Sequence, residues 1–341
     1  MSRISAIDSE FDGFRRIYLN FASHHDDQEV AVHWYANDLG EAFVNPQGVY
    51  TRLFLERWID EASVLYVHTL HLAEHVMDWL ATGKVVVDIH GVTPEEEVMM
   101  GRQSLREKFE AIEVEVLQNA VRCVAVSRSM TEHYKAKYPK IPARWIVVPV
   151  FESYSSALNL AVRDYRLSLE LPVSVVYAGG AQPWQNIDAM VSMAERTRSF
   201  ARFEFLSQDQ GSIKNTATKY QLRPDTVFAF CEKNALPDKY RNCDFGLLLR
   251  DESAVNRVSS PTKLIEYILF GAIPIVRSPN IGDFSEFGYA YVLEEEFCDG
   301  FFPDRISRQW MAETNVSVAH ALAGRFADGA RDLKELILSM A

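Results

Sequence analysis

Several features that define common protein classes are scarce or missing in this chain of 341 residues. It has only four cysteines, and none stand in the Cys-x-x-Cys spacing typical of structural zinc sites and redox motifs. No stretch approaches the ~20 apolar residues that span a bilayer. Basic residues number 35 against 47 acidic ones, which gives a formal net charge of -12. Nucleic acid is therefore a poor partner, because its phosphates require a basic surface.

Signatures of several enzyme classes are absent as well. The chain contains no Gly-x-Ser-x-Gly nucleophile motif and no Asp-x-Asp metal motif. The pair Gly179-Gly180 lacks the third glycine of the dinucleotide fingerprint, which argues against a nicotinamide cofactor. We therefore expect no cofactor and no bound metal.

The composition is that of a soluble globular protein long enough for two domains. Apolar residues make up 48% and charged residues 24% of the chain. Scattered cysteines and a first segment without an apolar run predict a cytoplasmic location. Residues 122–144 are locally basic. Two interpretations of them stay open: a solvated helix face, or peripheral contact with anionic lipid or a lipid-phosphate acceptor at the inner face of the membrane.

Short β-branched runs alternate with helical patterns along the chain, which indicates βαβ units and parallel sheets. We predict two doubly wound, Rossmann-like α/β domains, 1–150 and 151–341, joined by a Ser/Tyr-rich linker at 152–156. The expected strands lie near 17–21, 30–35, 63–67, 84–88, 122–126 and 145–148, and then near 173–178, 202–206, 226–230, 244–248, 273–276 and 289–292.

The segment from Ser259 to Val276 carries the strongest functional signal. Ser260 suits a helix N-cap and Pro261 the first helical position. A helix N-terminus attracts anions through its unpaired N–H groups, and Lys263 adds a positive charge in the same turn. Glu266 lies four residues beyond Thr262, on the same helix face. A cation near the helix start and a carboxylate one turn further in suit a nucleotide sugar.

Other polar residues and glycines follow the predicted strands. In parallel sheets, ligands bind beyond the carboxyl ends of strands, where the strand order reverses. These strand ends carry His68, His90 with Gly91, Ser127, Gly179 with Gly180, and Arg250. We expect all of them to face a cleft between the two domains.

In their order and spacing, four segments resemble the GT-B glycosyltransferases, specifically the retaining enzymes of glycosyltransferase family 4. Residues 85–91, with Pro94 and Glu95, resemble the family's amino-domain loop, whose histidine approaches the donor sugar. Residues 124–130 resemble the strand and helix start that follow it. Residues 175–180 resemble the glycine turn that opens the carboxy domain, and residues 259–276 resemble the donor-binding helix.

The resemblance implies a GT-B fold and metal-independent transfer, with retention, of a sugar from a UDP- or GDP-sugar to a saccharide or lipid-linked saccharide. The variant with Pro-Thr-Lys before the helix resembles members that build bacterial surface polysaccharides. By this resemblance Lys263 meets the diphosphate, Glu266 the ribose hydroxyls and His90 the donor sugar. A final helix at about 317–341 is expected to cross back onto the first domain.

The chain departs from the family pattern in two ways. The first of the family's two glutamates falls at Val258, and the arginine and lysine after the glycine turn fall at Gly180 and about Gln185. Either Arg250 and Lys263 replace those cations, or the chain is a catalytically inactive GT-B-like subunit that supports a partner glycosyltransferase.

Histidines raise a further question in the first domain. His68, His71 and His75 invite a metal interpretation, but a structural or acceptor-binding role fits better because no cysteine is near and His68 ends a strand. We therefore take His68, His71 and Ser127 as acceptor-side candidates. Asp88 either orients His90 or caps a turn. The glutamates at 95–97 suit the first turn of a helix and need no catalytic role.

Overall fold

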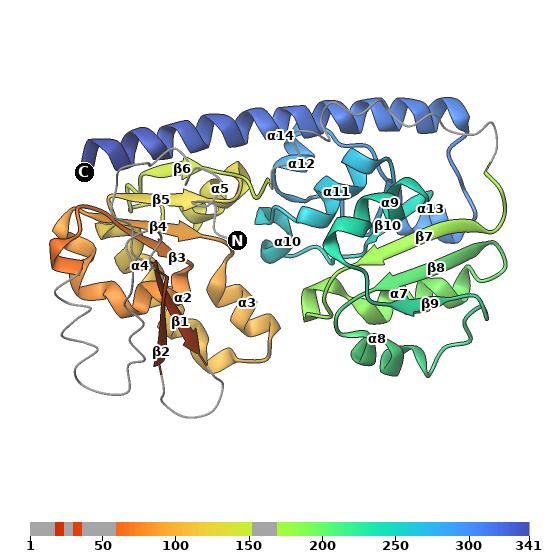
Figure 1. Ribbon diagram of the computed structural model, residues 1–341, viewed down its shortest axis with the longest axis horizontal. Coiled ribbons are helices and arrows are strands. Elements are labelled where there is room, and N and C mark those ends of the chain that lie inside the picture. The colour runs from red at the N-terminus through yellow and green to blue at the C-terminus, as the bar shows by residue number, and fades with distance from the viewer. Residues whose placement is uncertain (1–17, 24–29, 36–58, 152–168, 341) are drawn as a thin grey trace.

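The computed structural model describes residues 18–23, 30–35, 59–151 and 169–340 of the chain. They form an α/β structure with two parallel sheets in two domains, as the sequence predicts (Figure 1). The predicted linker at 152–156 lies outside the described residues. In Figure 1 the strands of both sheets point toward the boundary between the domains. The carboxyl ends of both sheets therefore face each other.

The amino-domain sheet has four parallel strands in the order β3-β4-β5-β6. Its central strand β4 is buried along its whole length, as expected for a strand covered on both faces. The strands are β3 (Leu65–His68), β4 (Val85–Ile89), β5 (Arg122–Ala125) and β6 (Trp145–Val147). The helices are α2 (Leu70–Ala73), η3 (Glu74–Thr82), α3 (Thr93–Met99), η4 (Gln103–Leu105), α4 (Arg106–Asn119) and α5 (Arg128–Lys137).

The first two strands differ from the expectation of parallel pairing. β1 (Tyr18–Ser23) and β2 (Val30–Tyr35) pair antiparallel in a two-stranded sheet of their own. The reason lies in the spacing: only six residues separate them. A parallel pair needs a crossover of about a dozen residues, so a short connection can only make a hairpin.

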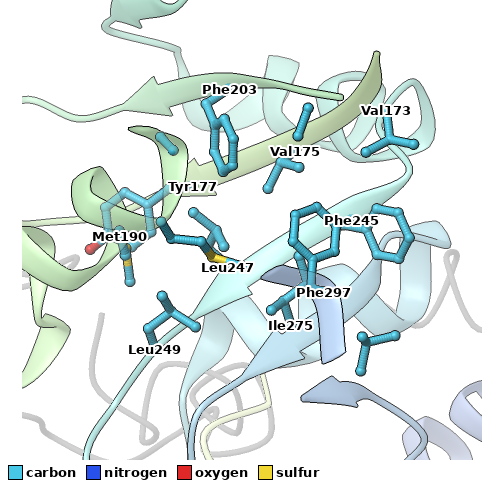
Figure 2. Close-up of a cluster of buried hydrophobic side chains, with 14 of the residues drawn as sticks. Val173, Val175, Tyr177, Met190, Phe203, Phe245, Leu247, Leu249, Ile275 and Phe297 are labelled. Carbon is cyan, nitrogen blue, oxygen red and sulfur yellow. The ribbon is translucent and has the colours of Figure 1, made fainter. Parts of the chain in front are cut away.

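The carboxy-domain sheet has six parallel strands in the order β12-β11-β10-β7-β8-β9. The order reverses between β7 and β10, the crevice where such sheets bind ligands. The strands are β7 (Val173–Ala178), β8 (Ala201–Leu206), β9 (Val227–Ala229), β10 (Phe245–Leu248), β11 (Ile273–Val276) and β12 (Val292–Leu293). Figure 2 shows aromatic and β-branched side chains of β7, β8, β10 and β11 packing into one core cluster.

Helices cover both faces of this sheet. They are η5 (Pro183–Gln185), α7 (Ile187–Arg196), α8 (Gln210–Ala217), η6 (Lys233–Ala235), α9 (Leu236–Arg241), α10 (Ala254–Val258), α11 (Thr262–Phe270), α12 (Gly282–Phe287) and α13 (Glu294–Cys298). The side chains of α11, α12 and α9 form a second buried cluster with β7, β10 and β11. Helix α11 thus packs over β7 and β10, where the strand order reverses.

One long helix, α14 (Arg305–Met340), runs along both domains (Figure 1). It begins at Arg305 rather than near residue 317, because Asp304 accepts a hydrogen bond from the Ser307 N–H at 2.7 Å and caps it. Its middle packs in the carboxy-domain core through Leu322, and its end packs on the amino-domain sheet through Leu333. Apolar side chains of α14 therefore pack against both domains.

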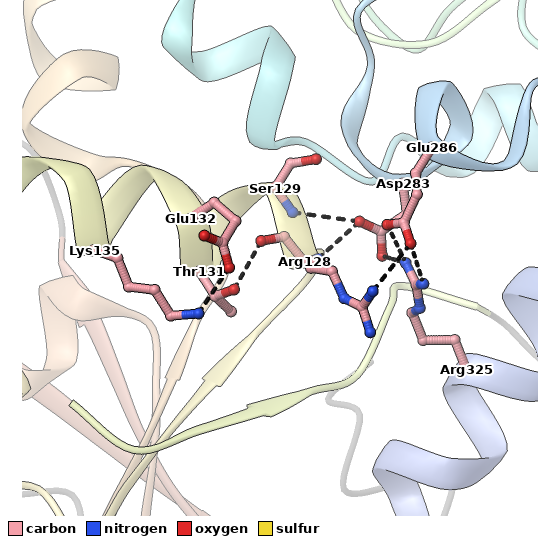
Figure 3. A network of polar contacts seen from close by, with 8 residues as sticks. All are labelled: Arg128, Ser129, Thr131, Glu132, Lys135, Asp283, Glu286 and Arg325. Atoms are coloured by element: carbon pink, nitrogen blue, oxygen red, sulfur yellow. Dashed lines mark hydrogen bonds and ion pairs between the residues drawn. The ribbon is translucent and has the colours of Figure 1, made fainter. Parts of the chain in front are cut away.

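A polar network also joins the domains (Figure 3). Asp283 of α12 accepts hydrogen bonds from the backbone N–H groups of Arg128 and Ser129 at the start of α5, at 2.7 and 3.4 Å. The same carboxylate pairs with Arg325 of α14 at 2.7 Å, and Glu286 pairs with both Arg325 and Arg128. This network fixes how the strand ends of the two sheets face each other.

Candidate functional site: a cleft at the carboxyl ends of both sheets

Helix α11 starts one residue later than the sequence pattern predicts. Pro261, not Ser260, is the N-cap, because its ψ of 120° lies outside the helix and its carbonyl accepts from the Leu264 N–H at 3.1 Å. The Ser260 hydroxyl is buried and has no hydrogen-bond partner among the described atoms. A buried hydroxyl without a partner beside a helix N-terminus suits a polar ligand.

Lys263 lies in the second helical position and is almost fully buried. Its ammonium donates to the Gln185 side-chain oxygen at 2.8 Å and to the Tyr177 hydroxyl at 3.1 Å, and lies over the Tyr177 ring. A Cβ at position 179 would come within 2.5 Å of this nitrogen, so Gly179 makes room for it. Burial, with a contribution from Arg250, holds the lysine pKa well below its usual 10.5.

Arg250 follows β10 and is also buried. Its guanidinium donates one long hydrogen bond of 3.3 Å to the Ser259 hydroxyl, and its Nε has no partner among the described atoms. Burial lowers its pKa to about 10. Within the described residues, neither Arg250 nor Lys263 forms an ion pair. Two buried cations without a carboxylate partner make a site for an anion.

The other donor-side residues lie around these cations. Gly179 and Gly180 follow β7 directly, Gln185 holds Lys263, and Thr262 is exposed at the helix start. One Glu266 oxygen accepts a hydrogen bond from the Tyr240 hydroxyl at 2.7 Å. The structure thus gathers every donor-side candidate at the reversal of strand order.

His90 follows β4 on the opposite side of the cleft. Its Nε2 lies 3.1 Å from Asp88, whose fully buried carboxylate also accepts from the Tyr66 hydroxyl at 2.8 Å. The His68 and His90 rings lie 4.0 Å apart. This geometry favours Asp88 as the residue that orients His90 over the alternative of a turn cap. His68, Asp88 and His90 form one group: a ring nitrogen of each histidine and a carboxylate oxygen of Asp88 all lie within 4.8 Å of one another.

Two acceptor-side candidates, His71 and Ser127, make contacts within the protein. His71 hydrogen-bonds Glu97 at 3.0 Å and packs edge-on against Phe109, apart from the His68 group. Ser127 is fully buried, where it caps α5 by accepting from the Met130 N–H and donates to the Val258 carbonyl of the other domain. Ser127 therefore lies in the contact between the domains, and its role as an acceptor-side residue stays a prediction.

Sequence reasoning missed Glu96. Its carboxyl lies over Gly91, beside His90, and interacts electrostatically with Arg250 from the other domain. Burial first, then Glu97 and Glu95, raises its pKa to about 7. Three consecutive glutamates in a first helical turn give no signal that one of them faces a cleft.

Three of the six basic residues in the stretch 122–144 form ion pairs with other described residues. Lys137 bonds Glu113 and Glu95, Lys135 pairs with Glu132, and Arg128 pairs with Glu286. These contacts favour the interpretation as a helix face over a lipid-binding patch. Among the described helices, none combines the length and apolarity that crossing a bilayer requires.

Comparisons with known proteins bear on the fold. No family model matches the chain, and no curated protein matches its sequence. Solved structures do match. Sucrose-phosphate synthase from Thermosynechococcus elongatus has a TM-score of 0.62 at 13% identity, over 85% of this chain and 78% of that one. The Anabaena protein Alr3699/HepE, in complex with UDP-glucose, has a TM-score of 0.58 at 12% identity, over 83% and 82%.

A third match is an α,α-trehalose-phosphate synthase (UDP-forming) from Burkholderia vietnamiensis, with a TM-score of 0.57 at 12% identity, over 84% of this chain and 79% of that one. These likenesses, together with the two facing sheets, define the chain as a GT-B fold protein. The predicted fold class is therefore confirmed.

Proposed function

We propose that the chain is a glycosyltransferase that transfers a sugar from a UDP- or GDP-sugar to a saccharide or lipid-linked saccharide acceptor. The observation that carries this proposal is the pair of buried, unneutralised cations, Arg250 and Lys263, at the reversal of strand order. The solved structures with the same fold include a UDP-forming synthase and a complex with UDP-glucose.

In this proposal Arg250, Lys263 and the start of α11 bind the diphosphate, and Glu266 binds the ribose. His90, oriented by Asp88, contacts the donor sugar. The transfer is retaining and needs no metal: the acceptor hydroxyl attacks from the leaving-group side and the diphosphate takes its proton. The enzyme contributes positioning and charge stabilisation. We place the reaction in surface polysaccharide biosynthesis, in the cytoplasm.

A second candidate function is a catalytically inactive subunit with the same fold. Gly180 and Gln185 stand where the family has cations, and Val258, where it has a glutamate, is buried and apolar. A transfer assay separates the candidates. In an active enzyme His90→Ala lowers turnover while nucleotide affinity stays near wild type, because only the transition state loses a contact.

The direct test is a calorimetric titration with UDP and GDP. Lys263→Met is expected to weaken binding of the preferred nucleotide by roughly 1.5–3 kcal/mol, the range for hydrogen bonds to a charged group. Lys214→Ala, which removes an exposed lysine of α8, is the matched control and should bind like wild type. Wild-type protein that binds neither nucleotide, or unchanged affinity in Lys263→Met, would contradict the proposal.

A further inference from the structure

Glu96 differs from its neighbours on α3 in having no cation of its own. Glu95 accepts a hydrogen bond from Lys137 at 3.0 Å, and Glu97 pairs with Arg102. Glu96 forms no ion pair within the described residues. The general preference of acidic residues for the first helical turn explains the sequence of three glutamates, but it does not explain why one of them is directed into the cleft.

The position of the Glu96 carboxyl is closely defined. A Cβ on Gly91 would come 1.8 Å from the Glu96 Oε1 atom, so the carboxyl rests directly on the backbone of the loop that carries His90. Only glycine at 91 leaves this space. The carboxyl is thus held beside the residue assigned to the donor sugar.

Arg250 faces Glu96 from the other domain. Each affects the other's protonation electrostatically, yet they form no ion pair. The region between the domains therefore holds a buried guanidinium and a partly buried carboxyl group, and neither forms an ion pair within the described residues. A ligand satisfies both if it carries phosphate at one end and hydrogen-bond donors at the other.

We propose that Glu96 accepts hydrogen bonds from hydroxyl groups of the transferred sugar and so contributes to donor specificity. The proposal rests on the proposed function, because the diphosphate at Arg250 and Lys263 is what brings the sugar between His90 and Glu96. A carboxylate with two oxygens matches two neighbouring sugar hydroxyls. In this arrangement the amino domain selects the sugar and the carboxy domain binds the nucleotide.

The test compares Glu96→Gln with wild type by calorimetry, using UDP, GDP, UDP-glucose and GDP-mannose. Loss of one charged hydrogen-bond acceptor should weaken binding of the preferred sugar nucleotide on the order of tenfold. Affinity for the free nucleoside diphosphate should stay within about twofold of wild type. The reason is that Glu96 contacts only the sugar in this arrangement, so its substitution and nucleotide binding are independent. Glu107→Gln, an exposed glutamate in the first turn of α4, is the control.

Gly91→Ala supplies an independent variant, because the added methyl displaces the carboxyl without deleting it. It should show the same selective loss. Equal losses for nucleotide and sugar nucleotide, or unchanged affinity for the sugar nucleotide in Glu96→Gln, would overturn the inference. If nucleotide binding depends on Lys263 and Glu96→Gln has no effect, only this inference fails. If wild-type protein binds no nucleotide, the proposed function fails with it.

Discussion

At the scale of single residues, the cleft combines groups that are costly to bury. Lys263 and Arg250 are buried in the carboxy-domain half and Glu96 is partly buried in the amino-domain half, and none of the three forms an ion pair within the described residues. Hydrogen bonds from Lys263 to Gln185 and Tyr177 offset only part of the cost. Such residues reduce stability in the empty protein, and a bound ligand recovers the loss.

Lys263→Met should therefore stabilise the empty protein by roughly 0.5–2 kcal/mol, while it weakens nucleotide binding by roughly 1.5–3 kcal/mol. Burial lowers the lysine pKa, so the folded protein binds fewer protons than the unfolded chain between the lowered pKa and the usual 10.5. The gain is largest at pH values below the lowered pKa and shrinks as the pH rises toward 10.5. Chemical denaturation at several pH values measures it. A less stable variant would mean that Lys263 is structural.

At the scale of elements, α14 is one apolar connection between the domains. The middle of this continuous helix packs against the carboxy domain, and its last turns pack against the amino domain. At Gly329 the helix approaches β6 so closely that a Cβ would lie 2.0 Å from the Val147 carbonyl oxygen. At Gly324 a Cβ would meet nothing within 4 Å.

The same substitution should therefore have opposite effects at these two positions. Gly329→Ala forces α14 away from β6 and should destabilise the protein by about 1–3 kcal/mol. Gly324→Ala should stabilise it by roughly 0.5–1 kcal/mol, because alanine loses less backbone entropy in a helix. Thermal unfolding of both variants tests the contact. Equal and small effects would show that α14 does not pack on β6 as described.

At the scale of the whole molecule, the cleft depends on how the two domains are held. Asp283 satisfies two backbone N–H groups at the start of α5 and pairs with Arg325 (Figure 3). Ser127, next to this helix start, donates to the Val258 carbonyl at 2.6 Å. The domain contact thus lies directly beside the proposed sugar site.

Asp283→Ala should lower the free energy of unfolding by about 2–3 kcal/mol, because it removes the acceptor of the two helix N–H groups and one of the two carboxylates that pair with Arg325. It should also increase the radius of gyration in solution scattering as the domains separate. Asp328→Asn, which removes one end of the exposed pair with Arg331, is the control and should have no measurable effect. An unchanged radius of gyration would show that α14 alone holds the domains.

The sequence by itself determined the fold class and most of the strands. Buried parallel strands are rich in β-branched residues, so local composition is enough to locate them, as in β4 and β7. Local chemistry also gave the expectation that the segment around Lys263 binds an anion, which stays a prediction. The hairpin of β1 and β2 was within reach of the sequence too, because a six-residue connection excludes parallel pairing.

Only the tertiary structure decided which of these groups meet. The N-cap at Pro261 depends on a backbone angle, and the burial of Ser127 depends on a carbonyl 131 residues away. The electrostatic interaction between Glu96 and Arg250 arises where the two domains come together. Local sequence sets propensity and pattern, but burial and electrostatic partners depend on contacts between distant segments, which no local pattern encodes.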